Sequence, residues 1–165
     1  MEKKYNPMEF NNAVKCPICG QLVFMDDYGN MDKCATCGWS GRSGDELLEK
    51  WHGISYPMLV PLSRAREQYK AGQKFKATFE DFINGLKWYK EMLFWHNNKF
   101  HAVRYRSIGI VLESKDMEII YKNIENFVAH ANIEGRLLKD IWDEVVHPCF
   151  MYCGEEHDYD HPPED

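Results

Sequence analysis

Residues 16–38 read CPICGQLVFMDDYGNMDKCATCG, with a Cys-x-x-Cys-Gly motif at each end. Each motif puts two thiols on one tight turn, and the glycine after the second cysteine tolerates the positive φ that such a turn needs. The two cysteine pairs are separated by fourteen residues. This pattern is typical of a zinc ribbon, in which four thiolates surround one metal ion. The metal ligands that it predicts are Cys16, Cys19, Cys34 and Cys37.

Zinc is the metal that we expect, because it accepts four thiolates and has no geometric preference of its own. Iron in a rubredoxin-like site is the main alternative, since Cys-Pro-x-Cys-Gly occurs there too, and a redox-active dithiol is a third interpretation. A closed four-sulfur site leaves no position for a substrate. We therefore expect a structural zinc, which stabilises a ribbon too small to bury a core unaided.

The composition is that of a globular chain, with 44% hydrophobic and 28% charged residues among 165. This length suffices for one ordinary domain and a small appendage. No apolar stretch approaches the roughly 20 residues of a membrane span, and the first residues do not resemble a secretory signal. We therefore expect a cytoplasmic protein with reduced cysteines and no membrane partner.

Charge is unevenly distributed along the chain, whose net charge is −6. Nine acidic residues and no Lys or Arg lie between Asp140 and Asp165, so the preceding residues carry a net charge of +3. This asymmetry argues against a generally basic nucleic-acid binder. An acidic tail at 154–165 would suit a basic partner, or mimicry of a nucleic acid.

Local signals divide the rest of the first half. A β-prone run at 21–25 and a turn at 26–30 predict a hairpin that carries one cysteine knuckle at each end. The capping box that begins at Ser43 predicts a short helix to about Trp51, and a second helix is expected over 62–72. The domains predicted are a polar lead-in at 1–14, a zinc ribbon with its short helix at 15–60, a helical domain at 61–153 and the acidic tail.

Helical periodicity dominates residues 78–145. A capping box at Thr78 predicts a long helix to about His96, and amphipathic stripes predict further helices over 117–131 and 133–145, with Asn132 as a cap between them. Residues 101–113 are β-prone but have no obvious partner strand, so we favour helix there. The predicted fold is α+β, with an N-terminal zinc ribbon followed by a mostly helical domain.

The long helix would carry a second apolar stripe, formed by residues at i, i+4 and i+7. We interpret this stripe as a surface for a protein partner or for self-association, since Trp and Met are enriched in interfaces. Burial on both sides of the helix is the alternative. The stripe consists of Trp88, Met92 and Trp95.

Two further groups are candidate sites. A basic stretch over 62–76 could meet the phosphates of a nucleic acid, or form a solvated helix face; it contains Arg64, Arg66, Lys70, Lys74 and Lys76. A second metal site is conceivable near the C-terminus, although Asp- and His-rich tails are often merely solvated. Its ligands would be His147, Cys149, Cys153, His157 and His161.

Residues 15–72 resemble the bacterial cysteine-rich CPCC domain. The shared features are the first knuckle, Trp39 after the second knuckle, and a helix with Ala65 and Tyr69 that ends near Gly72. Ile18 replaces the extra cysteine of the first knuckle in that family, and the second knuckle also departs from the pattern. The resemblance implies a metal-binding module of bacterial or phage origin, with a binding role such as immunity or phage–host inhibition.

No enzyme signature occurs in the sequence, which contains neither GxSxG, a P-loop, GxGxxG nor HExxH. We therefore expect a non-enzymatic protein-binding module with a structural zinc. The first alternative is a nucleic-acid-binding regulator that uses the ribbon and the basic helix. The second is an enzyme on an unfamiliar helical scaffold.

Overall fold

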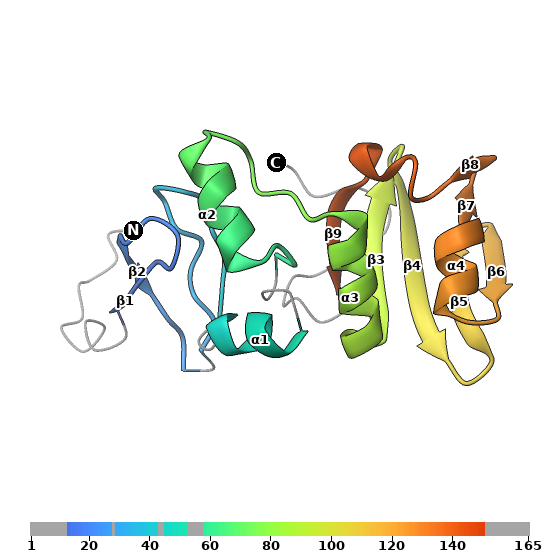
Figure 1. Ribbon diagram of the computed structural model, residues 1–165, viewed down its shortest axis with the longest axis horizontal. Helices are drawn as coiled ribbons and strands as arrows, with labels where there is room; N and C mark the ends of the chain where they lie inside the picture. The colour runs from blue at the N-terminus through green and yellow to red at the C-terminus, as the bar shows by residue number, and fades with distance from the viewer. Residues whose placement is uncertain (1–12, 28, 43–44, 53–57, 151–165) are drawn as a thin grey trace, which may run out of the picture. The chain divides into compact units, whose positions relative to one another are not determined.

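The computed structural model describes residues 13–27, 29–42, 45–52 and 58–150 (Figure 1). The chain divides into two compact units, Met1–Lys76 and Ala77–Asp165. Within the described ranges, no helix combines the length and the apolar character needed to cross a membrane.

The first unit begins with an antiparallel pair, β1 (Ala13–Lys15) and β2 (Leu22–Phe24), connected by the first cysteine knuckle. The chain then turns back through an isolated bridge between Met25 and Met31, and the second knuckle follows. The predicted strand at 21–25 is confirmed as β2. The predicted hairpin with its turn at 26–30 is also present, since Asp32 donates its N–H to the carbonyl of Phe24 and Asp26 donates its N–H to that of Asn30. The sequence analysis did not expect β1, a second partner of β2 that the first knuckle connects to it.

Two helices follow the knuckles, α1 (Asp45–His52) and α2 (Leu62–Lys70), where the sequence predicts them. The predicted cap of α1, Ser43, lies outside the described residues. Leu62 and Ala65 on α2 are buried, as is Trp39, whose ring meets that of Phe75 edge-on with centroids 5.2 Å apart. These contacts form a small apolar core beside the metal ligands.

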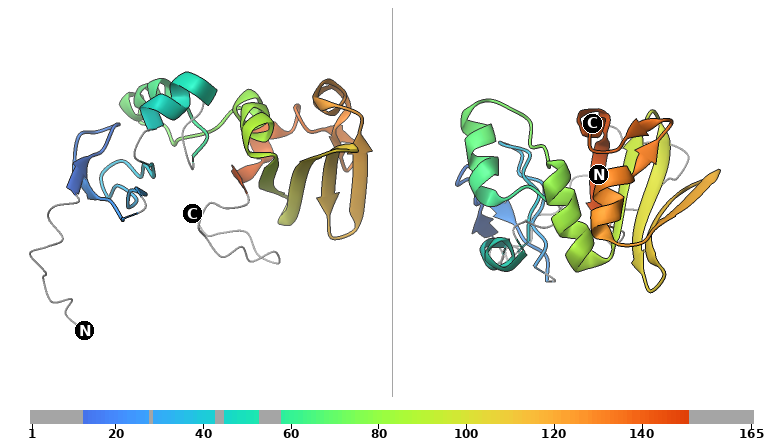
Figure 2. Two further views of the ribbon diagram at one scale, coloured as in Figure 1. Left: turned by 90° about the horizontal axis from the view of Figure 1, so that it is seen from below. Right: turned by 45° about the vertical axis from the view of Figure 1, so that its right-hand side comes forward.

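The second unit is built on a five-stranded antiparallel sheet in the order β6-β5-β4-β3-β9. Two helices, α3 (Phe79–Tyr89) and α4 (Ile124–His130), lie on the same face of this sheet (Figures 1 and 2). A separate two-stranded hairpin, β7–β8, and a 3-10 turn, η2 (Trp142–Glu144), connect α4 to the last strand. The strands are β3 (Glu91–His96), β4 (Lys99–Arg106), β5 (Gly109–Ser114), β6 (Met117–Tyr121), β7 (Asn132–Ile133), β8 (Arg136–Leu137) and β9 (Val146–Phe150).

The prediction of a mostly helical second domain is therefore wrong. Helix α3 begins as predicted, at a capping box in which Thr78 and Asp81 exchange hydrogen bonds, but it ends at Lys90 and not at His96. Lys90 adopts the left-handed conformation, with φ of 65°, and the chain continues as β3. Met92 through His96 are all buried, so both faces of the strand are covered. The sequence of β3 therefore lacks the alternation of apolar and polar residues that marks a half-exposed strand.

Residues 101–113 are strands and not the helix that we favoured, because their missing partner is β3. Asn97 and Asn98, expected to end a helix, instead form the two-residue turn between β3 and β4. Their φ angles of 50° and 57° are those of a type I′ turn, whose twist matches that of paired strands.

The two predicted C-terminal helices are also largely wrong. Residues 117–131 form β6 and the short α4, which is capped by Asn123; residues 133–145 form the rest of the β7–β8 hairpin and η2. Asn132 does not cap a helix. Its side-chain oxygen accepts a hydrogen bond of 2.9 Å from the N–H of Gly135, in the turn between β7 and β8.

An aromatic cluster joins the helices to the sheet. Trp142 of η2 packs against Phe82 of α3 and Phe94 of β3, with ring centroids 4.9 and 6.2 Å apart. The three rings are at most 5% exposed and form the centre of the core of this unit.

Candidate metal centre

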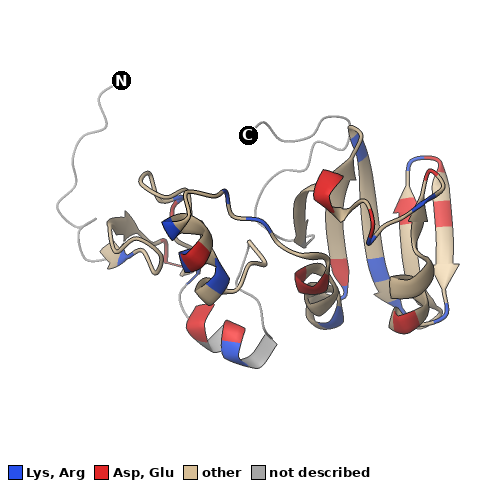
Figure 3. Ribbon diagram, turned by 45° about the horizontal axis from the view of Figure 1, so that its top comes forward, with Lys and Arg blue, Asp and Glu red and all other residues tan. Residues whose placement is uncertain are grey.

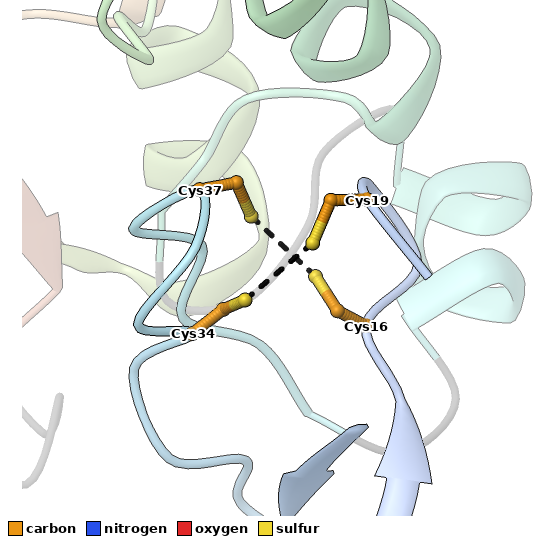
Figure 4. Close-up of side chains that lie close together, drawn as sticks. All are labelled: Cys16, Cys19, Cys34 and Cys37. Carbon is orange, nitrogen blue, oxygen red and sulfur yellow. Dashed lines mark hydrogen bonds between the residues drawn. The ribbon is translucent and has the colours of Figure 1, made fainter. Parts of the chain in front are cut away.

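The four cysteines of the two knuckles converge on one point (Figure 4). The Sγ atoms of Cys16 and Cys37 are 3.6 Å apart, those of Cys19 and Cys34 are 3.5 Å apart, and all four lie within 4.8 Å of one another. Four sulfurs at about 2.3 Å from a zinc ion at the centre of a tetrahedron would be about 3.8 Å apart. A disulfide would need about 2.05 Å. The arrangement thus fits a metal ion such as zinc and not a pair of disulfides.

The two knuckles have the same backbone hydrogen bonds. In each, the first cysteine donates its N–H to the carbonyl five residues later, at 2.7 Å to Gln21 and 2.8 Å to Trp39. The glycine donates back to the carbonyl of that first cysteine, at 2.9 Å from Gly20 and 2.7 Å from Gly38. Both glycines have positive φ, 78° and 75°, as the sequence motif predicts. The local sequence of each knuckle therefore orients its two sulfur atoms toward the same point.

Backbone N–H groups also point at the sulfurs. Burial raises the pKa of Cys34, but the N–H groups of Cys37 and Thr36 outweigh it and bring this pKa down to about 7. Burial raises the pKa of Cys37 despite an N–H donor from Trp39, and it likewise raises the pKa of Cys19. A metal ion must displace the protons from these thiols, so binding releases protons to solvent.

A metal ion bound by these four cysteines would have no open coordination position. Cys16 and Cys34 are 2% exposed, and Cys19 and Cys37 are half-buried. Four thiolates complete the tetrahedral coordination of zinc, whereas catalytic zinc sites have three protein ligands and keep one position for water or substrate. The same four sulfurs would also suit iron.

The second predicted metal site is not formed by the residues that can be described. His147 and Cys149 lie on β9, while Cys153, His157 and His161 fall outside the described residues. Within the described part of the chain, only the four knuckle cysteines bring three or more metal-binding atoms together.

The three residues of the predicted partner-binding stripe do not lie on one helix and do not share one exposed surface. Trp88 lies on α3 and is 51% exposed, whereas Met92 and Trp95 lie on β3 and are 0% and 4% exposed. The helical spacing that linked them in the sequence is interrupted at Lys90, where the helix ends.

The predicted basic helix is shorter than its run of charges. Helix α2 ends at Lys70, so Lys74 and Lys76 lie beyond it, and Glu67 is interspersed with the bases that remain (Figure 3). Arg66 is turned toward the ribbon, since its Nε donates a hydrogen bond of 2.9 Å to the carbonyl of Pro17 and its guanidinium lies 3.6 Å from Glu46. The five basic side chains therefore do not form one uninterrupted helix face.

Two features that the sequence analysis missed are candidates for function. Leu22 and Phe24 on β2 are 69% and 48% exposed, although both are large and apolar. His96 and His101 on β3 and β4 are almost fully buried. Only the pairing of β3 with β4 brings the two histidines together, through the two-residue Asn97-Asn98 turn.

The structure supports a zinc-ribbon-like arrangement of knuckles beside an N-terminal hairpin, which is the coarser part of the resemblance to the CPCC domain. Comparison with protein-family models, curated proteins and solved structures finds no match to this chain.

Proposed function

We propose that this chain is a non-enzymatic protein-binding protein in which one zinc ion, held by Cys16, Cys19, Cys34 and Cys37, fixes the shape of a binding surface on the N-terminal unit. The metal would act as a structural staple. The convergence of four sulfurs at separations suited to zinc supports this part of the proposal.

The binding surface proposed is the exposed side of β2. Leu22 and Phe24 alternate with Val23, which is 7% exposed, so both point away from the interior of the unit. In the register of the hairpin they pair with Lys15 and Ala13. Exposed large apolar side chains cost free energy in water unless something covers them. Leu22 and Phe24 lie next to a knuckle whose shape the metal would hold, and this position is the main support for the proposal.

A protein partner fits this surface better than a nucleic acid does. Aliphatic and aromatic side chains supply the centre of protein interfaces, whereas phosphate recognition needs unengaged cations. Arg66, one of the five bases of the predicted basic helix, is engaged with Pro17 and Glu46. Inhibition of the partner, as in immunity or phage–host proteins, stays a prediction.

The metal part is tested by elemental analysis of the purified chain, which should contain one zinc per molecule. Cys34→Ser should lose the metal, while Cys149→Ser, which changes a cysteine on β9, should keep it. A chain that carries neither zinc nor iron would refute the staple.

The binding part is tested by affinity capture from the source cell with the zinc-loaded chain as bait. The double variant Leu22→Ser/Phe24→Ser should lose the captured protein and keep its zinc. Ile108→Ser is the matched control, because Ile108 is 61% exposed in the second unit and should not affect capture. If the double variant captures the same protein equally well, β2 is not the surface, and salt-dependent retention on DNA or RNA would favour the regulator instead.

A further inference from the structure

Two histidines are buried on the helix-covered face of the five-stranded sheet. His96 ends β3 and His101 lies on β4, and each is 2% exposed. His101 pairs in register with Phe94, two residues before His96, so the imidazoles lie on the same face, one diagonal step apart. The ring of Phe94 stacks on His101 with centroids 5.1 Å apart and also contacts Trp142 of η2. The pair therefore lies under the segment that contains η2.

Three of the four ring nitrogens in this pair have no hydrogen-bond partner among the described residues: Nδ1 of His96 and both nitrogens of His101. The fourth, Nε2 of His96, lies 3.4 Å from a carboxylate oxygen of Glu144. A buried polar group without a partner is already unfavourable, and a buried charge without one is far more so. The closed structure therefore accommodates a neutral His101 and opposes its protonation.

Charged groups approach the pair from the surrounding elements, but they are already engaged with one another. Glu134, in the turn between β7 and β8, forms an ion pair with Lys99 of β4. Glu144 of η2 accepts two hydrogen bonds from Arg136 of β8, at 3.0 and 2.6 Å. Each carboxylate is thus matched by a cation. Glu134 still favours a protonated His101 and Lys99 opposes it, but the burial of the ring outweighs both.

We propose that residues 132–144, comprising β7, β8 and η2, form an acid-sensitive cover that opens when His101 is protonated, while β3, β4 and β5 stay paired. Within the cover, β7 and β8 pair only with each other and contribute no strand to the five-stranded sheet. Opening must also separate Trp142 of η2 from Phe82, Phe94 and the carbonyl of Ala77, but it breaks no pairing among β3, β4 and β5. Ile133 and Leu138, both buried, hold it closed while the rings beneath are neutral.

The size of the effect follows from linkage. Burial, followed by the nearby charge of His96, lowers the pKa of His101 to about 4, whereas an exposed histidine has a pKa of about 6.5. Between these values the open form binds one proton more than the closed form. The opening equilibrium should therefore rise about tenfold for each pH unit that the solution is acidified within this window.

Hydrogen exchange of the full chain, followed by mass spectrometry at about pH 7, 6 and 5 and corrected for intrinsic rates, tests the proposal. Peptides from 132–144 should open about threefold more at pH 6 than at pH 7, which lies above the window, and about sevenfold more at pH 5 than at pH 6. Those from β3 to β5 should not change. His101→Phe keeps an aromatic ring against Phe94 and cannot titrate, so it should remove the pH dependence. His130→Gln is the control, because His130 is exposed on α4 and the variant should behave as wild type.

Acid also competes for the knuckle cysteines, so the chain is measured with a chelator at about pH 7 as well. Chelation should not open 132–144 if the histidine is responsible. The proposal is overturned if the cover and the sheet strands lose protection together, if chelation at neutral pH opens the cover, or if His101→Phe retains the wild-type response. If His101→Phe does not fold, His101→Gln replaces it in the test. Glutamine is polar and does not titrate, so this variant should also remove the pH dependence of opening.

Discussion

The indole Nε1 of Trp142 donates a hydrogen bond of 2.9 Å to the carbonyl of Ala77, the residue directly before the N-cap of α3. This bond is buried and joins residues 65 positions apart in the chain. Removing a donor leaves a buried carbonyl unsatisfied, which costs about 1–3 kcal/mol.

Trp142→Phe should therefore lower the free energy of unfolding by about 1–3 kcal/mol, since it deletes the donor while a ring still contacts Phe82 and Phe94. Urea denaturation followed by circular dichroism measures the change. Trp88→Phe, at a position 51% exposed, should cost under about 0.5 kcal/mol. Equal effects of the two variants would contradict the role given to the bond.

Gly109 begins β5 with φ of 130°, and a Cβ placed there would lie 2.2 Å from the carbonyl oxygen of Tyr121 on β6. Gly109→Ala should therefore destabilise the second unit by about 2–4 kcal/mol, because strain and a backbone clash add. Gly135→Ala also has positive φ but meets open space, and it should cost only about 1 kcal/mol. Thermal unfolding of the two variants under the same conditions provides the comparison; a smaller loss for Gly109→Ala would show that β5 and β6 can separate locally.

Thr78→Ala removes the hydroxyl that accepts a hydrogen bond from the N–H of Asp81, which is one half of the capping box. The other half, from the N–H of Thr78 to the Asp81 carboxylate, stays. The loss should be about 1 kcal/mol. Ser107→Ala, in the exposed turn between β4 and β5, is the matched hydroxyl deletion and should be close to neutral. Denaturant midpoints that do not separate these two variants would mean that the cap contributes nothing to stability.

Zinc affinity should fall as the pH is lowered, because protons compete for the thiolates. Burial raises the pKa of Cys37 and of Cys19, so these thiols bind protons in the absence of metal, while Cys34 has a pKa of about 7. Competition with a chromophoric chelator at a series of pH values measures the trend. An affinity that does not depend on pH would show that sulfur does not hold the metal.

The sequence predicts the features whose cause is local. Cysteine spacing with a following glycine specifies each knuckle, and the capping box at Thr78 specifies where α3 begins, because the interacting groups lie within a few residues of one another. The end of α3 has no such signal. Lys90 ends the helix in a left-handed conformation that lysine seldom adopts.

Strands were missed because their stabilising contacts are distant in sequence. Met92, Phe94 and Trp95 are covered on both faces of β3, so the run shows no alternation, and it coincides with the helical spacing of the residues before it. When residues 91–96 are predicted to be helical, residues 101–113 have no partner strand in the sequence. The two buried histidines escaped notice for the same reason, since only the β3–β4 register brings them together.

The hydrogen bond from Arg66 to the carbonyl of Pro17 attaches α2 to the loop that carries Cys16 and Cys19. Metal loss would release that loop, and α2 would then lose the hydrogen bond that attaches it to the knuckle. A nine-residue helix is only marginally stable by itself in water, so α2 depends on this contact. The ribbon and α2 would unfold as one cooperative segment and become open to proteases together.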